Sequence, residues 1–214
     1  MLNMTEEINI KVNRNGKANV KTIFRKVAFL KSASAMGDLP NTDKYEIAFA
    51  GRSNVGKSSL LNALAGVKRL AKVSNTPGRT QLINYFSVDD EFYLVDLPGY
   101  GYAKASKDRI AVWNKFVNRY LKERNNLRLV LLLIDSRHGV KDTDRTTMAM
   151  LDSAGVSYQI VLTKLDKLRP SETPKIGVEF ADHPALQTEI IQTSSEKGKG
   201  IEELQKRIAS FRKT

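Results

Sequence analysis

The chain has 214 residues, of which 41% are hydrophobic, and its 35 Lys and Arg against 23 Asp and Glu give a formal net charge of +12 at pH 7. It contains no cysteine and two histidines, which excludes disulfide scaffolds, cysteine metal sites and conventional zinc sites. Its apolar runs are too short to span a membrane and no secretory signal is recognisable, so a cytoplasmic protein with no membrane partner is expected. The excess positive charge either serves solubility or suits a polyanion such as nucleic acid, and its clustering favours the polyanion.

The length fits one domain with short extensions, and a monomer is the default expectation. Residues 1–28 are polar and basic and are predicted to form a mobile N-terminal arm. The stretch VAFLKSASAM (27–36) is nevertheless apolar enough to dock on the body. Residues 29–214 are expected to form the domain itself.

Strand and helix patterns alternate along the domain. Two apolar segments separated by Asp-Asp-Glu indicate a β-hairpin. The remaining strands are joined through helices, which predicts an α/β fold: a six-stranded, mainly parallel sheet with one antiparallel strand and helices on both faces. The expected strands are 45–50, 82–88, 92–96, 127–135, 157–163 and 188–193. The expected helices are 57–66 and segments near 106–125, 142–154, 172–181 and 200–212.

The stretch GRSNVGKS (51–58) matches the phosphate-binding loop, or P-loop, pattern GxxxxGK[ST]. Gly51 and Gly56 allow successive backbone N–H groups to face phosphates without interference from a Cβ. Lys57 is expected to reach the β- and γ-phosphates, and the Ser58 hydroxyl to ligate Mg²⁺. The loop lies between a predicted strand and a predicted helix, whose N-terminus favours an anion. The sequence therefore predicts a nucleotide site here.

A second motif, DLPG (96–99), closes the hairpin. Asp96 would hold Mg²⁺ through a water and the Gly99 N–H would sense the γ-phosphate, although a simple Pro-Gly turn is the alternative. Many nucleotide-hydrolysing switch proteins carry next a glutamine that orients the attacking water. Here the residue is Tyr100. Either the protein does not hydrolyse nucleotide, or the water is handled otherwise.

Two further motifs follow later strands. Asp166 of TKLD (163–166) could accept both the N1–H and the N2–H₂ of guanine, and the stem of Lys164 could lie over the base. The alternative is an ordinary loop beside a helix, but the end of a strand in such a sheet is where ligands bind. TSS (193–195) would supply backbone for the guanine carbonyl.

Together, GRSNVGKSSLLNAL, SNTPGRTQLINYF, DLPGYGYAK, TKLDK and SSEKGKG resemble the EngB/YsxC family of bacterial ribosome-biogenesis GTP-binding proteins, one of the TrmE-Era-EngA-EngB-Septin-like GTPases. The resemblance extends from about Phe29 to the C-terminus. It implies a P-loop GTPase fold and slow hydrolysis of GTP to GDP as a switch in large ribosomal subunit assembly. It also implies a requirement for normal cell division and septation.

The resemblance further implies site residues. Mg²⁺ would be held by Ser58 and Thr80, although spacing alone also fits Thr76. Lys57 and Thr80 would act in catalysis together with Asn54, which either coordinates K⁺ in place of an arginine finger or only shapes the loop. The implied nucleotide contacts are Gly51, Arg52, Ser53, Asn54, Val55, Gly56, Lys57, Ser58, Gly78, Arg79, Thr80, Gln81, Leu82, Asp96, Leu97, Pro98, Gly99, Thr163, Lys164, Leu165, Asp166, Thr193, Ser194 and Ser195.

The helix expected over 106–126 has two contrasting faces. One is apolar and is expected to pack into the core: Ile110, Trp113, Phe116, Val117, Tyr120 and Leu121. The other is basic, with further basic residues upstream: Lys115, Arg119 and Lys122, after Lys104, Lys107 and Arg109. The basic side is either a solvated surface or a contact for RNA phosphates, and its one-sidedness favours RNA. The expected partners are the large-subunit precursor, with its rRNA and ribosomal proteins.

Three functions compete at this stage. The leading one is a GTPase switch that docks on a ribosomal precursor. An alternative is a nucleotide-gated RNA- or protein-binding module with negligible intrinsic hydrolysis. A metabolic P-loop kinase is disfavoured, because TKLD specifies guanine and the sequence has no evident arginine-rich lid.

Overall fold

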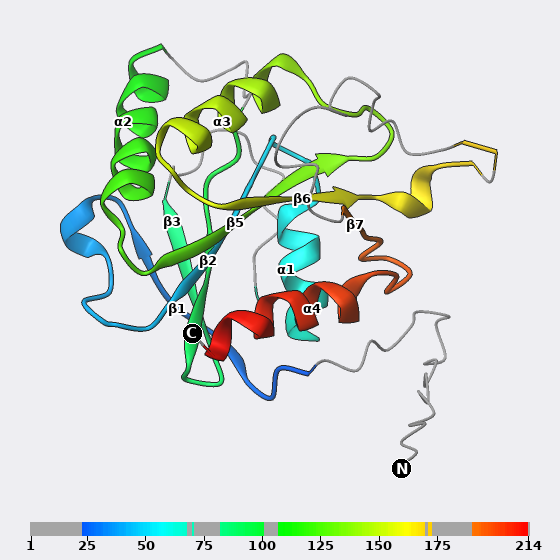
Figure 1. Ribbon diagram of the computed structural model, residues 1–214, viewed down its shortest axis with the longest axis horizontal. Coiled ribbons are helices and arrows are strands. Elements are labelled where there is room, and N and C mark those ends of the chain that lie inside the picture. The colour runs from blue at the N-terminus through cyan, green and yellow to red at the C-terminus, as the bar shows by residue number, and fades with distance from the viewer. Residues whose placement is uncertain are drawn as a thin grey trace.

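A computed structural model describes residues 23–67, 70, 82–100, 107–169, 171–172 and 190–213. One sheet of seven strands lies at its centre, with strand order β1-β3-β4-β2-β5-β6-β7 (Figure 1). β3 runs antiparallel to both of its neighbours, and every other pair is parallel. The strands are β1 (Val27–Ala33), β2 (Glu46–Gly51), β3 (Ile83–Val88), β4 (Phe92–Asp96), β5 (Leu127–Asp135), β6 (Tyr158–Thr163) and β7 (Ile191–Gln192).

The predicted count of six strands is wrong, because the residues around position 29 form a seventh. β1 forms an edge of the sheet and pairs with β3 from Val27 opposite Val88 to Ala33 opposite Ile83. It therefore begins before residue 29, where the domain was expected to start. Phe24 is buried as well, with its ring edge-on to Phe92 at 5.7 Å between centroids.

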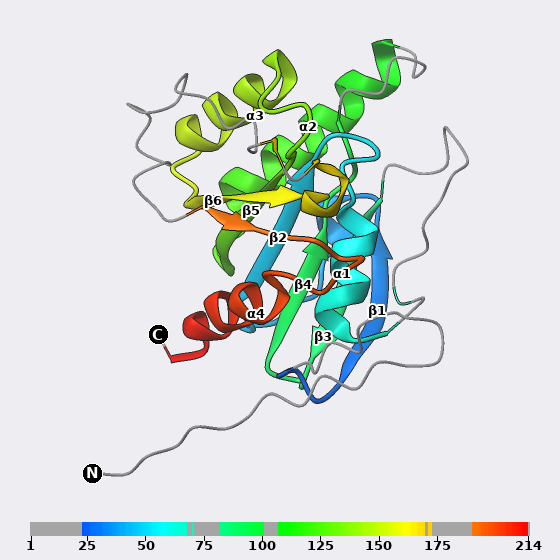
Figure 2. The same cartoon turned by 90° about the vertical axis from the view of Figure 1, so that its right-hand side faces the viewer.

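Helices cover both faces of the sheet, as expected, and each face has its own apolar core (Figure 1, Figure 2). The helices are α1 (Lys57–Ala65), α2 (Lys107–Glu123), α3 (Asp142–Ser153) and α4 (Ile201–Ala209), with short 3-10 turns at Met36–Asp38, Leu165–Lys167 and Ser210–Lys213. On one face, α2 and α3 bury side chains such as Tyr120 and Leu151. On the other, α1 and α4 bury Leu64 and Leu204. The helix expected at 172–181 lies almost entirely outside the described residues.

The apolar face predicted for α2 is confirmed where its side chains are described. Val117, Tyr120 and Leu121 are buried, and Phe116 packs against the same core while partly exposed. The periodicity of this helix thus identifies a packing surface and not a platform for nucleic-acid bases. Two further predicted members have side chains outside the described residues: Ile110 and Trp113.

A buried carboxylate anchors the end of α2 to the sheet. Glu46, at the start of β2, is fully buried and accepts hydrogen bonds from the hydroxyls of Tyr85 (3.1 Å) and Tyr120 (2.8 Å). Arg124, just after α2, donates to the same carboxylate at 2.8 and 2.6 Å and to the Pro40 carbonyl at 2.7 Å. Burial first, and the negative charge of Glu46 second, raise the pKa of Tyr120 well above its ordinary value, so that its hydroxyl remains a donor.

A buried amide joins the two ends of the described chain. Gln205 of α4 donates from its side chain to the Leu64 carbonyl of α1 at 2.7 Å. Its side-chain oxygen accepts from the Ile23 backbone N–H at 3.3 Å. The N-terminal segment, α1 and α4 are thereby held together beside the second core.

In the part of the chain that the structure describes, no helix has the length and apolar character needed to cross a membrane.

Candidate nucleotide-binding site

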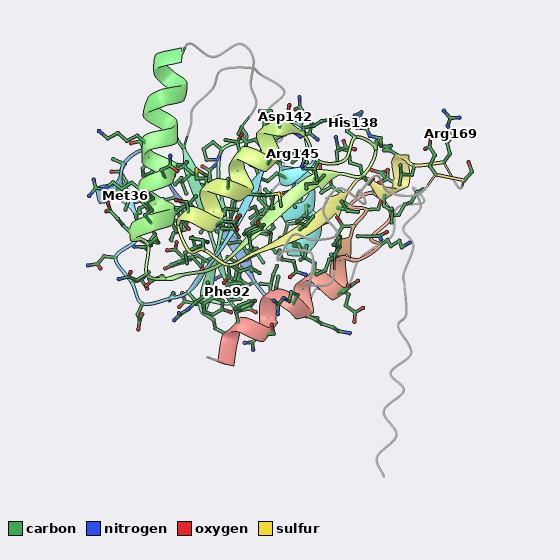
Figure 3. The ribbon with its side chains drawn as sticks, turned by 45° about the horizontal axis from the view of Figure 1, so that its top comes forward. Met36, Phe92, His138, Asp142, Arg145 and Arg169 are labelled. Atoms are coloured by element: carbon green, nitrogen blue, oxygen red, sulfur yellow. The ribbon has the colours of Figure 1, made fainter. Side chains whose placement is uncertain are left out.

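The predicted motifs gather at one edge of the sheet. Because β2, β4, β5, β6 and β7 are parallel, their carboxyl ends meet at the same side, where α/β sheets bind ligands. In Figure 3, His138, just beyond the end of β5, lies at this edge, and Phe92, at the start of β4, lies at the opposite end of the molecule. The candidate site is therefore built from loops that leave neighbouring strands.

The P-loop connects β2 to α1 through a tight turn. Gly51 ends β2 with no room for a side chain, since an ideal Cβ would lie 2.8 Å from Val55 Cγ1. Asn54 and Gly56 have positive φ values of 63° and 109°, the conformation that turns successive N–H groups to one side. α1 begins directly afterwards at Lys57, so Ser58 lies in its first turn. The prediction of a strand at 45–50, a glycine-rich loop and a helix at 57–66 is confirmed, each element within one residue of its expected bounds.

The P-loop lysine and the aspartate of DLPG meet at this edge. Asp96 is the last residue of β4, opposite Phe49 of β2, and its carboxylate accepts a hydrogen bond from Lys57 Nζ. The following residue, Leu97, donates from its backbone to the Phe49 carbonyl at 3.0 Å. Two motifs far apart in sequence thus place opposite charges together where the first turn of α1 begins.

Gly99 and Tyr100 lie directly along the P-loop backbone. The Ser53 N–H donates to the Tyr100 carbonyl at 3.0 Å, and the Tyr100 N–H donates to the Gly51 carbonyl at 3.3 Å. An ideal Cβ on Gly99 would lie 3.1 Å from the Ser53 nitrogen, Cα and Oγ. Only a residue without a side chain fits this approach comfortably. Backbone hydrogen bonds therefore hold the end of DLPG directly against the P-loop.

The Tyr100 side chain points to α3. Its hydroxyl donates to Asp144 Oδ1 at 2.8 Å, and Arg52 Nε of the P-loop lies 3.2 Å from Asp144 Oδ2. Asp144 is fully buried and also accepts from the Lys141 backbone N–H at 2.9 Å. Burial, reinforced by the Asp144 charge, raises the pKa of Tyr100 far above its ordinary value. No sequence pattern points to Asp144 as a site residue, because Tyr100 and Arg52 are distant from it along the chain.

The TKLD motif holds the P-loop from the other side. Thr163 Oγ1 donates to the Val55 carbonyl at 2.7 Å, and Lys164 Nζ donates to the Asn54 carbonyl at 2.6 Å. Lys164 itself has a positive φ of 60°. Its ammonium also lies 3.0 Å from the carboxylate of Asp135, the last residue of β5. Asp135 is a second site residue that sequence reasoning missed.

Asp166 is oriented by the loop that follows β7. Ser194 Oγ donates to Asp166 Oδ1 at 2.6 Å, and the Leu165 N–H donates to the Thr193 carbonyl at 3.1 Å. Burial acts to raise the pKa of Asp166, but the Ser194 hydrogen bond and further donors outweigh it, so the pKa lies below its ordinary value. TKLD and TSS, weak signals separately, are thus in direct contact, and Ser195 continues the same turn.

The loop after β7 returns to α4 through a second glycine turn. Gly200 precedes α4 with φ of 70°, and an ideal Cβ there would overlap the Gln192 carbonyl oxygen. The backbone of Ser194 pairs with Lys199 across this turn at 3.0 Å. Gly200 therefore controls the path of the loop that contacts Asp166, although it belongs to none of the predicted motifs.

Part of the predicted site lies outside the described residues. The described predicted residues all lie at this edge, including Leu82, which directly precedes β3, and Pro98 in the DLPG turn. No group of three or more His, Cys, Asp and Glu able to hold a metal ion occurs among the described residues. The predicted switch residues outside the described residues are Gly78, Arg79, Thr80 and Gln81, together with the alternative Thr76.

Comparison with known proteins gives consistent matches. Residues 46–164 match the family model described as 50S ribosome-binding GTPase. A relative from Ruegeria pomeroyi, named "Probable GTP-binding protein EngB", is 52% identical over 185 residues, which cover 85% of this chain and 85% of the relative. A relative of the same name from Rhizobium meliloti is 47% identical over 211 residues, covering 92% of this chain and 97% of the relative. A solved structure of an Aquifex aeolicus Era variant with GDP and tetrafluoroaluminate has a TM-score of 0.60 and 27% identity, covering 78% of this chain and 56% of that one.

Proposed function

The chain belongs to the EngB family of GTP-binding proteins, within the ribosome-binding GTPases, and we propose that it hydrolyses GTP to GDP as a cytoplasmic switch in large ribosomal subunit assembly. Cell division and septation would depend on it through the supply of ribosomes. The observation that carries this proposal is the convergence of the P-loop, Asp96, TKLD and TSS at one sheet edge. The proposed phosphate end and the proposed guanine end are thereby linked by direct contacts.

The proposed phosphate end consists of the P-loop and the residues beside it. Lys57 would neutralise the β- and γ-phosphates, and the N-terminus of α1 would add its partial positive charge. Mg²⁺ fits this end, because Ser58 and Asp96 offer oxygen donors and Asp96 already contacts Lys57, next to Ser58. We assign Ser58 and Thr80 as its protein ligands. When bound, the ion would offset the negative charge of the phosphates.

Asn54 is our proposed ligand for K⁺. It is exposed at the tip of the P-loop with a positive φ of 63°, and its backbone carbonyl is already occupied by Lys164. The amide side chain would therefore supply the oxygen. Hydrolysis should be faster in K⁺ than in Na⁺, and Asn54→Ala should abolish that difference. Equal rates of the parent protein in the two salts would contradict the assignment.

Guanine selectivity tests the base end directly. We expect GTP and GDP to bind far more tightly than ATP, because Asp166 can accept from both guanine donors. Asp166→Asn should weaken GTP binding by at least about tenfold and favour xanthosine nucleotides, since one acceptor becomes a donor. Affinities for GTP, GDP, ATP and XTP measured side by side decide this. An Asp166→Asn variant that binds GTP like the parent would contradict the assignment.

One observation favours the alternative of a binding module with negligible hydrolysis. The Tyr100 hydroxyl is engaged with Asp144 on α3, so this residue offers no group to orient a water. Turnover measured with and without large-subunit particles separates the two functions. A switch should hydrolyse GTP faster on the particle, whereas a gated module should bind it in GTP and leave the nucleotide intact.

The proposed contact with rRNA uses the exposed side of α2. Lys115, Arg119 and Lys122 are all exposed there, but Arg119 donates to both oxygens of Glu123 at 2.9 Å. We therefore assign the phosphate contacts chiefly to Lys115 and Lys122. Lys104 and the side chains of Lys107 and Arg109 lie outside the described residues.

Changing both lysines to Glu should weaken particle binding in GTP while GTP affinity is kept. The salt dependence of binding should also become shallower, by about one unit of slope for each RNA phosphate that is no longer neutralised. Co-sedimentation with large-subunit particles at several salt concentrations measures both effects. Unchanged co-sedimentation would place the docking surface elsewhere on the protein.

A further inference from the structure

Asp135 lies between the two halves of the candidate site. It ends β5, which separates the P-loop strand β2 from the TKLD strand β6 in the sheet. Its backbone is in register with Thr163, the first residue of TKLD. No motif in the sequence points to Asp135, yet its side chain reaches the lysine of TKLD.

The Asp135 carboxylate is buried and saturated with donors. Its side chain is 6% exposed, and Oδ1 accepts from Arg137 Nε at 2.9 Å and from the Arg137 backbone N–H at 3.1 Å. Oδ2 accepts from Arg137 Nη2 at 2.7 Å and lies 3.0 Å from Lys164 Nζ. Burial acts to raise the pKa of this carboxyl, but the hydrogen bonds from Arg137 and Lys164 outweigh it and hold the pKa below its ordinary value. Asp135 is thus charged when it faces Lys164.

Lys164 is held at several points along its length. Its backbone has a positive φ of 60°, which is unusual for a residue with a side chain. Its stem passes the P-loop, with Cε 3.6 Å from an ideal Cβ on Gly56. Its ammonium contacts the Asn54 carbonyl at 2.6 Å and the Asp135 carboxylate at 3.0 Å. A lysine so held has already lost much of the rotational freedom that it would otherwise lose when a ligand binds.

We propose that Asp135 is a positioning residue for nucleotide binding: its carboxylate holds the Lys164 ammonium on the P-loop, so that the lysine stem is in place before the guanine base arrives. This inference rests on the proposed guanine-nucleotide site. Asp135 would act only through Lys164. Its effect would be the same for GTP and GDP, because the two nucleotides share the guanosine part over which the lysine stem would lie.

A double-mutant cycle tests this coupling. Affinities for fluorescent GDP and GTP are measured for the parent, Asp135→Asn, Lys164→Met and the double variant, with thermal unfolding of each. Asp135→Asn should weaken both nucleotides equally, by about tenfold. In the Lys164→Met background the same change should have no further effect, because the group that Asp135 positions is gone. Asp135→Ser, which replaces the carboxylate by a small hydroxyl, is the second variant and should behave alike.

Asp142→Asn is the matched control. It removes the same charge from a fully exposed carboxylate in the first turn of α3 (Figure 3), 3.9 Å from Arg145, and should bind GDP and GTP like the parent. Equal losses from Asp135→Asn in both backgrounds would show a merely structural role and overturn the proposal. Parental affinity in Asp135→Asn would overturn it too. A parent protein that binds neither nucleotide would instead refute the proposed function, and the positioning role with it.

Discussion

Tyr100 stands where other nucleotide-hydrolysing switch proteins carry a water-orienting glutamine, but its hydroxyl is used to bind a buried carboxylate. Tyr100→Phe removes one donor from Asp144 while leaving the ring in place. We expect the free energy of unfolding to fall by about 1–3 kcal/mol. Denaturant unfolding measures this.

The same variant separates stability from chemistry. Because the hydroxyl contacts α3, intrinsic GTP hydrolysis by folded Tyr100→Phe should change little. A hundredfold loss would show that the hydroxyl takes part in the reaction. Tyr93→Phe is the control, since it removes the hydroxyl of another buried tyrosine, whose ring packs edge-on against Tyr85. It should leave both quantities nearly unchanged.

Gly200 and Gly155 form a natural pair for a second test. Both have positive φ values, 70° and 64°, but a Cβ on Gly200 would overlap the Gln192 carbonyl, whereas a Cβ on Gly155 would meet no atom within 4 Å. Gly155→Ala should therefore lower the free energy of unfolding by only about 1 kcal/mol, the cost of a left-handed backbone conformation in a residue with a side chain. Gly200→Ala should cost more and should also weaken GDP binding, because the loop that orients Asp166 must move. Thermal unfolding measures the loss of stability and GDP titration measures the affinity. Equal losses in the two variants would contradict an overlap between a Cβ at position 200 and the Gln192 carbonyl.

Among the elements, α2 and the residue that directly follows it provide two arginines in contrasting environments. Arg124 pairs with the fully buried Glu46, whereas Arg119 pairs with Glu123 at the surface. Arg124→Met should lower the free energy of unfolding by about 3–5 kcal/mol, because it leaves a buried charge without its cation. Arg119→Met should cost much less, because an ion pair at the surface contributes little to stability.

Denaturant unfolding of the two variants gives the comparison. Adding Glu46→Gln to Arg124→Met should restore part of the lost stability, because the uncompensated charge is then removed. Equal losses from the two arginine variants would mean that the Glu46 pair contributes no more than an exposed one.

Sequence patterns predicted those strands and helices whose residues have the same surroundings along the whole element. β5 and β6 are continuous apolar runs because both faces are covered, and α1 follows directly from the P-loop. β1 was missed because it is an edge strand without alternation. Phe29 and Leu30 are adjacent and both exposed, and the register shifts between Phe29 and Lys31. A bulged edge breaks the period on which such predictions depend.

The same distinction applies to the site. Lys57 and Asp166 belong to short motifs with fixed spacing. Their place at this edge of the sheet could therefore be predicted, together with the loops that carry them. Asp135 and Asp144 could not, because each acts through partners on other strands and loops. Gly200 was overlooked because the atom that requires it belongs to the Gln192 carbonyl. Long-range contacts of this kind leave no pattern in one sequence.

For the whole molecule, the buried carboxylates predict how stability depends on pH. The pKa values of Asp135 and Asp166 are lower in the folded protein than the ordinary value of 3.8. Their stabilisation is therefore complete above that value and is lost as the pH falls through it towards the folded-state pKa values. With only two histidines in the chain, thermal stability should be nearly constant between about pH 5 and 7 and should drop below about pH 4.

Thermal unfolding across this range checks the prediction. The net charge of +12 adds repulsion as carboxylates become protonated, so a comparison with Asp135→Asn is needed. That variant lacks one of the titrating groups and should lose less stability on acidification than the parent. Parallel curves for the two proteins would show that Asp135 is not a source of the acid sensitivity.

The buried amide of Gln205 belongs to a part of the chain that is synthesised after the segments it joins. Ile23, the first described residue, and Leu64 of α1 are both hydrogen-bonded to the Gln205 side chain of α4. During synthesis, the early strands and α1 leave the ribosome well before residue 205 exists. Until α4 follows, one face of the sheet has no α4 to cover it, and Leu60, Leu61 and Leu64 lack part of their packing. The nascent chain should therefore need protection from aggregation until α4 has emerged and can pack on this face.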